Sequence, residues 1–329
     1  MYDVITVGSS TIDTFASVES ELIKIKTVHY EEELIAYPSG SKILINDLKF
    51  FIGGGGTNTA VAFSRLGLNV GYVGKIGSGT NSGLILNALK KDKVDFLGVK
   101  SKSLHSGYSV ILDSLEGDRT ILAYKGANND LGFNEINLKK IKAKWFYFSS
   151  MVGRSYNTLE KLADYASKNN IKIAFNPSNY LAEKGYAFLK KLLDKTELLV
   201  LNKEEAILLG GKLDIPGLIT KLTELGSKIV VITDGKNGAY VNDRKKILHV
   251  KTSGIKPKET TGAGDAFAST FLAGIIMKKN LSECMKMGCA NSESVILNIG
   301  AKTGLLKLSK LKERLRRSNI RVEILNKKV

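Results

Sequence analysis

The chain is poor in the residues that stabilise small secreted folds and build metal sites. Its 329 residues include two cysteines, four prolines, three histidines and one tryptophan. Cys284 and Cys289 lie on different faces of a predicted helix, so we expect buried free thiols rather than a disulfide or a zinc site. The histidines lie too far apart in sequence to form a ligand pattern. A disulfide scaffold is therefore excluded, and a reducing cytoplasm is the expected compartment.

Long apolar runs are also missing. The segment Phe271–Met277 is far shorter than the roughly 20 residues that a membrane-spanning helix needs. The start of the sequence lacks the charged and apolar regions of a signal peptide, so none is expected and no membrane partner is predicted. With 43% hydrophobic and 25% charged residues, the composition is that of a globular protein with a substantial core.

Positive charge is in excess, with 49 Lys and Arg against 32 Asp and Glu and a net charge of +17. Residues 302–329 contribute +8 of that charge. Four leucines at helical spacing, Leu305, Leu308, Leu311 and Leu315, predict a packed amphipathic helix there with a solvated basic face. Because no RNA- or DNA-binding motif accompanies this segment, nucleic acid is not the expected partner.

Apolar strand-like runs alternate with amphipathic helical patterns through most of the chain. The predicted strands are Val4–Val7, Val70–Val73, Trp145–Phe148, Ile171–Phe175, Leu198–Leu201 and Ile229–Ile232. The predicted helices are Thr57–Leu66, Gly83–Lys91, Ser155–Lys168, Glu183–Leu193, Glu204–Leu209, Ile215–Leu225, Gly264–Lys278 and Leu281–Asn298. This alternation predicts an α/β fold with a mostly parallel central sheet flanked by helices on both faces.

Two segments interrupt that alternation, 15–51 and 106–124. The first holds short strand-like pieces at Lys24–Tyr30, Leu34–Tyr37 and Lys42–Ile45, and the second reads as a hairpin around Glu116-Gly117-Asp118. We expect the two segments to form one small β-sheet inserted into a single domain that spans residues 1–329. A movable cover over a site and an inert decoration are equally good interpretations of this sheet.

The strongest motif is Glu259-Thr260-Thr261-Gly262-Ala263-Gly264-Asp265, which directly precedes a predicted helix. Its small residues bring backbone N–H groups to the helix N-terminus, where anions bind. Asp265 lies in the first turn, placed either as a cap or to accept a proton from a hydroxyl that attacks a bound phosphate. The chain contains neither a P-loop motif nor a complete dinucleotide fingerprint.

Three further polar sites lie next to predicted strands or helices. The run Gly53-Gly54-Gly55-Gly56-Thr57-Asn58 exposes backbone for a polar ligand ahead of a helix. Asp13 follows the first strand, and Asn202 and Glu205 follow another, at the sheet edge where ligands of α/β proteins collect. Glu204 and Glu205 also suit the ordinary first turn of a helix.

Together and in this order, these motifs resemble those of the ribokinase-like, or PfkB-type, carbohydrate kinase family, from about Tyr2 to Gly304. The resemblance implies a β-sheet lid over an α/β domain, and transfer of the ATP γ-phosphoryl group to a sugar hydroxyl with Mg²⁺. It implies that Asp265 is the catalytic base and that the backbone of Gly262, Ala263 and Gly264 forms an anion hole. It assigns substrate binding to Asp13, Gly54, Gly55 and Asn58. It assigns ATP binding to Asn202, Thr233, Gly235, Gly238 and Gly264, and water-mediated Mg²⁺ binding to Glu205.

Some features depart from the family pattern or leave its details open. Glu259 stands where the family often has Asp beside a monovalent-cation site, which argues against activation by K⁺, although Gly300-Ala301 resembles a later part of that site. Lid aromatics, Tyr30, Tyr37, Phe50 and Tyr108, could stack on a nucleoside base or simply pack together. An acceptor that is already phosphorylated would need extra cations to bind its phosphate, and the candidates are Lys42, Lys75, Arg119 and Arg154.

Other functions remain open from the sequence. A nucleoside kinase of the same fold is the first alternative, followed by a non-catalytic ligand-binding regulator and a nucleic-acid binder. A homodimer through the lid is compatible with the family, because an open lid sheet has edges to cover.

Overall fold

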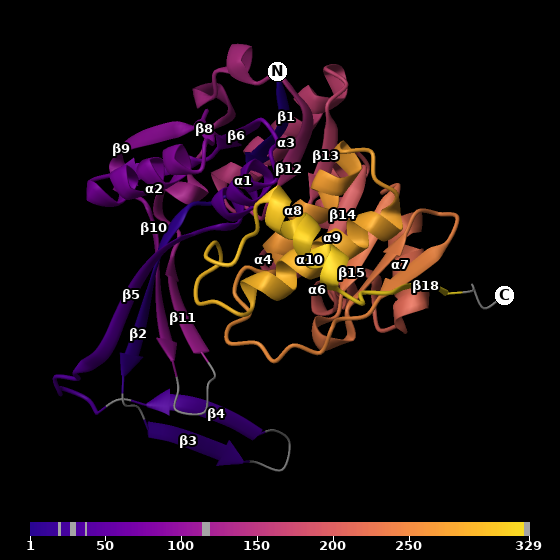
Figure 1. Ribbon diagram of the computed structural model, residues 1–329. Helices are drawn as coiled ribbons and strands as arrows, with labels where there is room; N and C mark the ends of the chain where they lie inside the picture. Colours follow the sequence, from indigo (N-terminus) through magenta and orange to yellow (C-terminus); the bar gives the residue numbers. More distant parts are fainter. Residues whose placement is uncertain (19–20, 27–30, 37, 114–118, 326–329) are drawn as a thin grey trace.

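The computed structural model describes residues 1–18, 21–26, 31–36, 38–113 and 119–325. Ten strands form its central sheet (Figure 1). In sheet order they are β18 (Val322–Leu325), β17 (Ile247–Val250), β16 (Ala239–Asn242), β15 (Ile229–Thr233), β14 (Leu198–Asn202), β13 (Lys172–Phe175), β12 (Ala143–Phe148), β1 (Tyr2–Val7), β6 (Val70–Val73) and β8 (Asp95–Phe96). From β15 to β8 all neighbours pair in parallel, whereas β16, β17 and β18 add an antiparallel edge. The predicted mostly parallel sheet is confirmed.

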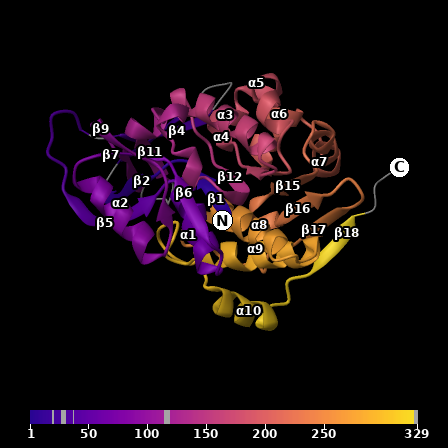
Figure 2. The same ribbon diagram turned by 90° about the horizontal axis from the view of Figure 1, so that it is seen from above.

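The parallel strands are mostly apolar and buried in their middle parts, because helices cover both faces of the sheet. On one face lie α1 (Gly55–Arg65), α2 (Thr80–Lys91), α8 (Ala263–Ile276), α9 (Leu281–Val295) and α10 (Leu308–Arg317), which share one hydrophobic cluster. On the other lie α3 (Arg154–Lys168), α4 (Ser178–Ala182), α5 (Gly185–Leu193), α6 (Lys203–Gly210) and α7 (Ile215–Glu224), which share a second cluster. Figure 2 shows the sheet between these two layers. No helix in the described ranges is long and apolar enough to cross a membrane.

A second sheet extends away from the α/β body (Figure 1). Its strands, in order, are β11 (Arg119–Tyr124), β10 (Gly107–Asp113), β2 (Thr11–Val18) and β5 (Ile45–Gly53). We call this sheet the lid. It begins and ends closer to the body than the range 15–51 predicts, because β2 leaves the end of β1 almost directly and β5 runs into α1. At its far end β3 (Glu21–Lys26) pairs with β4 (Glu31–Ala36).

Local sequence signals placed some lid strands wrongly. Residues 42–44 form no strand, and the chain becomes extended only at Ile45, where β5 pairs with β2. The β10–β11 hairpin is confirmed, although its predicted turn at Glu116-Gly117-Asp118 lies outside the described residues. Tyr30 and Tyr37 also lie in the undescribed part of the chain, so their predicted lid roles stay predictions.

The basic C-terminal segment is partly as predicted. Helix α10 forms with Leu311 fully buried and most of its basic residues exposed, while Arg314 lies 3.4 Å from the buried Glu293 of α9. Beyond the helix, however, the chain returns to the central sheet as β18, which pairs with β17. Short strands β7 (Lys75–Ser78) and β9 (Val99–His105) form a further pair beside α2.

Candidate functional site

The glycine run lies where the lid strand β5 passes into α1. Gly54 caps the helix with a φ of 92°, in the left-handed region that favours glycine, and a Cβ there would lie 2.5 Å from Ser9 O. A Cβ on Gly53 would lie 1.7 Å from Asp13 Oδ2, so the Asp13 carboxylate packs directly on that bare backbone. The glycines therefore allow the end of β1, the start of β2 and the start of α1 to meet closely.

Asp13 occupies the base of the lid, paired across the sheet with Phe51 and Ser109. Burial raises the pKa of this carboxyl, and hydrogen bonds with Thr11 and Ser109 and attraction to Lys302 oppose the rise. A buried carboxylate held in this way is suited to accept hydrogen bonds from ligand hydroxyl groups.

The N-terminus of α8 supplies free backbone donors. Gly262 caps the helix at a φ of 81°, and a Cβ there would lie 2.5 Å from Ala301 Cβ, so both backbone and packing require glycine. The Ala263 amide donates to Thr260 O at 3.1 Å. In the described part of the chain, the amides of Gly262 and Gly264 have no protein acceptor. Free amides at a helix N-terminus are typical of anion-binding sites.

Asp265 is tied to the glycine-rich segment by a side-chain hydrogen bond. Asn58 Nδ2, on the first turn of α1, donates to Asp265 Oδ2 at 2.9 Å. Burial raises the pKa of Asp265 to about 6, although the Asn58 hydrogen bond and the attraction of Lys302 lower it. The two strongest motifs of the sequence thus form one site, whose carboxylate has a pKa suited to a general base.

A polar cavity of about 220 Å³ opens beside Asp265 and Gly55; we call it the Asp265 cavity. Its other polar lining side chains are Ser9, Lys125, Asn128, Asn129, Ser149, Ser150, Asn176, Ser178 and Tyr180. The hydroxyls of Ser149, Ser150 and Ser178 are buried and have no hydrogen-bond partner within the described residues, so they are available to a ligand. Asp13, Gly54 and Asn58 do not line this cavity.

Sequence analysis missed these lining residues. Ser149 and Ser150 follow β12, and Asn176 follows β13. They therefore lie at the same carboxyl edge of the sheet that made Asp13 and Asn202 candidates. Applying that rule to every predicted strand would have found them.

A larger cavity, of about 470 Å³, lies on the other side of the α8 N-terminus; we call it the Gly264 cavity. Four of the predicted nucleotide-binding residues line it, namely Thr233, Gly235, Gly238 and Gly264. Its other walls include Val250, Ile255, Pro257, Phe267 and Ile296. A Cβ on Gly264 would meet nothing within 4 Å, so bare backbone faces the open space. Apolar walls with a few polar groups suit a flat heterocyclic ring that ends in a polar tail.

Asn202 and Glu205 line neither cavity, and their side chains bond to each other. Asn202 Oδ1 accepts the Glu205 amide at 2.7 Å, while Glu205 Oε2 accepts the Asn202 amide at 2.9 Å and its Oε1 accepts Asn202 Nδ2 at 3.0 Å. This is a capping box at the start of α6. Burial raises the pKa of Glu205, and repulsion from Glu204 and Asp265 adds to the rise.

Glu205 is the carboxylate predicted to hold Mg²⁺, through water. No cluster of three or more His, Cys, Asp or Glu side chains able to hold a metal occurs within the described ranges. A hydrated Mg²⁺ needs only one or two carboxylates when phosphate oxygens supply further ligands. The residues present therefore fit a magnesium ion that arrives with a phosphorylated ligand.

Lys302 is the largest departure from the sequence analysis, which assigned it to a solvated basic segment. Its Nζ donates to Ile52 O at 2.6 Å, to Thr57 Oγ1 at 2.9 Å and to Asn58 Oδ1 at 2.7 Å. Burial lowers its pKa to about 7, and the nearby carboxylates of Asp13 and Asp265 oppose this. The prediction was wrong for this residue because Lys302 precedes α10 and lies in the turn that packs on α1.

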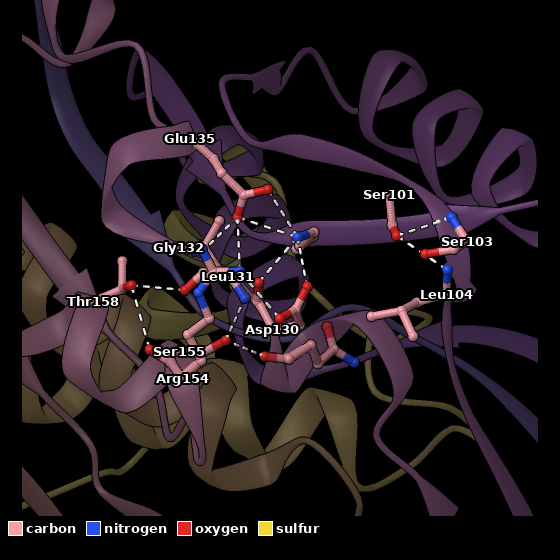
Figure 3. Close-up of polar contacts among 12 residues, drawn as sticks. Ser101, Ser103, Leu104, Asp130, Leu131, Gly132, Glu135, Arg154, Ser155 and Thr158 are labelled. Carbon is pink, nitrogen blue, oxygen red and sulfur yellow. Dashed lines mark hydrogen bonds and ion pairs between the residues drawn. The ribbon is translucent and has the colours of Figure 1, made fainter.

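Two of the cations considered for a phosphorylated ligand are already paired. Lys75 Nζ lies 2.7 Å from Asp130 Oδ2 and 2.9 Å from Glu135 Oε1. Arg154 Nη1 lies 3.2 Å from Asp130 Oδ1. Figure 3 shows Asp130, Glu135 and Arg154 within one network of polar contacts. This ion cluster fixes the segment that carries Asn128 and Asn129 into the Asp265 cavity. Lys42 is exposed, and the Arg119 side chain lies outside the described residues.

Glu259 is buried and joins the two segments that resemble the family's monovalent-cation site. Its Oε2 accepts the Gly300 amide at 2.6 Å. The same glycine carries a φ of 88° and packs on Phe51 of the lid. This carboxylate thus has a structural function at the α8 end of the site.

The two cysteines are confirmed as buried free thiols. Burial raises the pKa of each to about 12, so neither is a reactive thiolate.

Comparison with known proteins identifies the fold and the family. An Arabidopsis thaliana ribokinase complexed with ribose and ATP superposes with a TM-score of 0.82 at 20% identity, covering 96% of this chain and 99% of that one. A Methanocaldococcus jannaschii nucleoside kinase of the ribokinase family superposes with a TM-score of 0.79 at 22% identity, covering 96% and 99%. These likenesses show a ribokinase-like fold.

The sequence comparisons agree. An ATP-dependent 6-phosphofructokinase from Thermoanaerobacterium thermosaccharolyticum is 26% identical over 310 residues, which cover 91% of this chain and 89% of that protein. The pfkB family of carbohydrate kinases matches residues 13–308, a range that runs from Asp13 to the start of α10. The chain therefore belongs to the pfkB carbohydrate kinase family, whose members are ATP-dependent phosphotransferases that act on an alcohol group.

Proposed function

We propose that this chain transfers the γ-phosphoryl group of ATP to a hydroxyl of a sugar, with Asp265 as the catalytic base. The observation that carries the proposal is the position of two adjacent residues: Gly264 lines one cavity and Asp265 lines the other. A phosphoryl group has to pass between two ligands held on either side of this helix end. The helix N-terminus can stabilise its charge on the way.

The proposed roles follow from the geometry of the chain. The Asp265 carboxylate accepts the proton of the acceptor hydroxyl as that oxygen attacks the γ-phosphorus and the bond to the departing ADP oxygen breaks. The free amides of Gly262 and Gly264 donate to the oxygens of the moving phosphoryl group, while the Ala263 amide stays bonded to Thr260. Mg²⁺, when bound, neutralises charge on the phosphates, and Glu205 with Asn202 would hold its water ligands.

The adenine ring is proposed to occupy the Gly264 cavity. Thr233, Gly235 and Gly238 line it with small groups, and Val250, Ile255 and Phe267 provide apolar walls. Asn202, which pairs with Thr233 across β14 and β15, is proposed to contact the phosphates. The whole chain is proposed to form a single domain over residues 1–329, into which the lid is inserted.

A sugar is favoured over other acceptors by the lining of the Asp265 cavity. Serine hydroxyls and asparagine amides suit a small polyol, and Asp13, Gly54, Gly55 and Asn58 are proposed to bind the remaining hydroxyls under the lid. A nucleoside is the second candidate, because Tyr180 on the rim and Tyr108 in the lid offer aromatic surface. Lys125 is the only cation that lines this cavity among the described residues, which argues against an acceptor that is already phosphorylated.

The lid supports the proposal of a homodimer. Its exposed large apolar residues include Phe50 on β5 and Ile121, Leu122 and Tyr124 on β11. A second copy of the lid would cover such a surface. The free thiols Cys284 and Cys289 favour the cytoplasm as the compartment.

The test is a coupled assay of ADP formation with Mg²⁺ and ATP across pentoses, hexoses, their phosphates and nucleosides. We expect turnover with an unphosphorylated sugar and a rate at least about a hundredfold lower with Asp265→Asn. Turnover confined to nucleosides would establish the second candidate. A purified, folded protein that phosphorylates none of these acceptors would contradict the proposal.

A further inference from the structure

The cation of Lys302 is built into the site but belongs to none of the motifs that identify the family. The residue lies between Gly300 and α10, 244 residues beyond Asn58 in the chain. Its three hydrogen bonds go to one stretch, the end of β5 and the first turns of α1. An ammonium group has three protons, so every donor of Lys302 is used within the protein.

These contacts determine which way the Asn58 amide faces. Lys302 can only donate, so the oxygen of Asn58 must face it, and the nitrogen must face Asp265. Both distances agree with this orientation, at 2.7 Å from Lys302 Nζ to Asn58 Oδ1 and 2.9 Å from Asn58 Nδ2 to Asp265 Oδ2. Asp265 Oδ2 is thereby occupied. Its Oδ1 lies on the side of Gly55, 3.6 Å from the position of a Cβ there, and Gly55 lines the Asp265 cavity.

The backbone that carries Lys302 is itself anchored. Arg65 Nη1 donates to Lys302 O at 2.7 Å and to Leu305 O at 3.2 Å. The same guanidinium forms an ion pair with Asp92, with Nε 2.8 Å from Oδ1. The turn is therefore attached to the C-terminal end of α1, while the side chain of Lys302 bonds to its N-terminal end.

Charged groups from several elements surround the ammonium. Asp13 on β2, Asp265 on α8 and Asp92 after α2 attract it, and Arg65 on α1 repels it. Asp13 and Asp265 both feel its charge in return, which favours their ionised forms. Lys302 thus attracts both of the carboxylates that the proposed function assigns to substrate binding and to proton transfer.

We propose that Lys302 is a positioning residue for phosphoryl transfer: it holds the Asn58 amide so that Asn58 Nδ2 binds Asp265 Oδ2 and leaves Oδ1 free for the acceptor hydroxyl. This inference rests on the proposed function of Asp265. A purely structural function of Lys302 would leave the pKa of Asp265 unchanged. The proposed function requires that replacing Lys302 changes this pKa, and that the change depends on Asn58.

The experiment compares Lys302→Met with wild type and with Lys307→Met, a control on an exposed lysine of the same segment. Turnover and kcat/KM are measured from pH 5 to 9 with the best acceptor. We expect Lys302→Met to lower kcat about 10- to 100-fold. The acidic limb of its kcat/KM profile moves up by about one pH unit, because Lys302 no longer holds the Asn58 amide and the Asp265 carboxylate loses the hydrogen bond that lowers its pKa. Lys307→Met keeps the wild-type rate and profile, and Lys302→Arg, which retains the charge, keeps the wild-type acidic limb.

A double-mutant cycle tests the path through Asn58. In an Asn58→Ala background, Lys302→Met is expected to have a much smaller effect than in wild type. An equal effect in both backgrounds, or a Lys302→Met profile that coincides with wild type while kcat changes less than about twofold, would overturn the inference. Lys302→Gln replaces Lys302→Met in the same comparison if the methionine variant does not fold.

Failure of the proposed function is distinguishable from failure of this inference. If wild type phosphorylates no acceptor, the proposed function is wrong, and the positioning inference is then decided by titration alone. The ¹³C resonance of the Asp265 carboxyl, assigned by its loss in Asp265→Asn, is followed with pH in wild type and Lys302→Met. A higher pKa in the variant supports the inference, and an unchanged pKa overturns it.

Discussion

Asn58 Nδ2 donates to Asp265 Oδ2 across 207 residues of sequence, joining the first turn of α1 to the first turn of α8. The hydrogen bond connects the segment that ends the lid with the N-terminus of α8. The carboxylate therefore has one oxygen fixed by the protein and one directed toward Gly55. The predictions below depend on this arrangement.

Replacing Asp265 by Asn separates catalysis from binding. Turnover is expected to fall about a hundredfold or more, because an amide cannot accept the proton of the acceptor hydroxyl. The variant keeps the shape of the site, so the dissociation constant of ATP, measured by calorimetry, should change less than about threefold. Wild-type turnover in the purified variant would show that another group is the base.

The pH dependence of kcat/KM should report the ionisation of Asp265. Burial raises the pKa of this carboxyl to about 6, and only the deprotonated form can accept a proton. The rate should thus fall about tenfold per pH unit below that pKa. The residual activity of Asp265→Asn serves as the control and should lack this acidic limb. A wild-type rate that stays level down to pH 4.5 would contradict the prediction.

Substitution by alanine should destabilise the protein at Gly262 but weaken ATP binding at Gly264. Gly262→Ala imposes a side chain at a φ of 81° and against Ala301, so we expect a loss of about 1–3 kcal/mol of stability in urea unfolding. Gly264→Ala adds a methyl group to open space in the Gly264 cavity. Its unfolding midpoint should match wild type while KM for ATP rises. The reverse pattern would mean that the cavity is not the nucleotide site.

Glu205→Gln should weaken the response to Mg²⁺ without unfolding α6. Glutamine can still accept the Asn202 amide in the capping box, but its charge is gone. The Mg²⁺ concentration for half-maximal turnover should rise about tenfold. Glu204→Gln, on the same turn but exposed, is the matched control and should leave that concentration unchanged. Equal responses of the two variants would remove Glu205 from the magnesium site.

Structural features that depend on short stretches of sequence could be predicted. The alternation of apolar strands with amphipathic helices indicated the parallel sheet, and the apolar residues of β1 and β12 are indeed buried by helices on both faces. Gly262 and Asp265 were found because a helix N-terminus and its first-turn acid lie within a few residues of each other. The β10–β11 hairpin could be predicted because its two paired strands are neighbours in the sequence.

Features made by tertiary contact could not be predicted. Lys302 resembles the other basic residues of its segment, and only its packing on α1 distinguishes it. Lys75 and Arg154 were considered as free cations, yet acids on the segment before β12 neutralise them. The antiparallel edge formed by β16, β17 and β18 was also not predicted, because its short strands have no sequence pattern that distinguishes them from loops.

The distance along the chain between Asn58 and Lys302 affects when the site can form during synthesis. A ribosome adds roughly 5–20 residues per second, so the 244 residues between them take roughly 10 to 50 s to make. During that interval β2, β5 and α1 have already been made, and Asp13 lacks the attraction of Lys302. The nascent protein therefore cannot complete its site before Lys302 has been made.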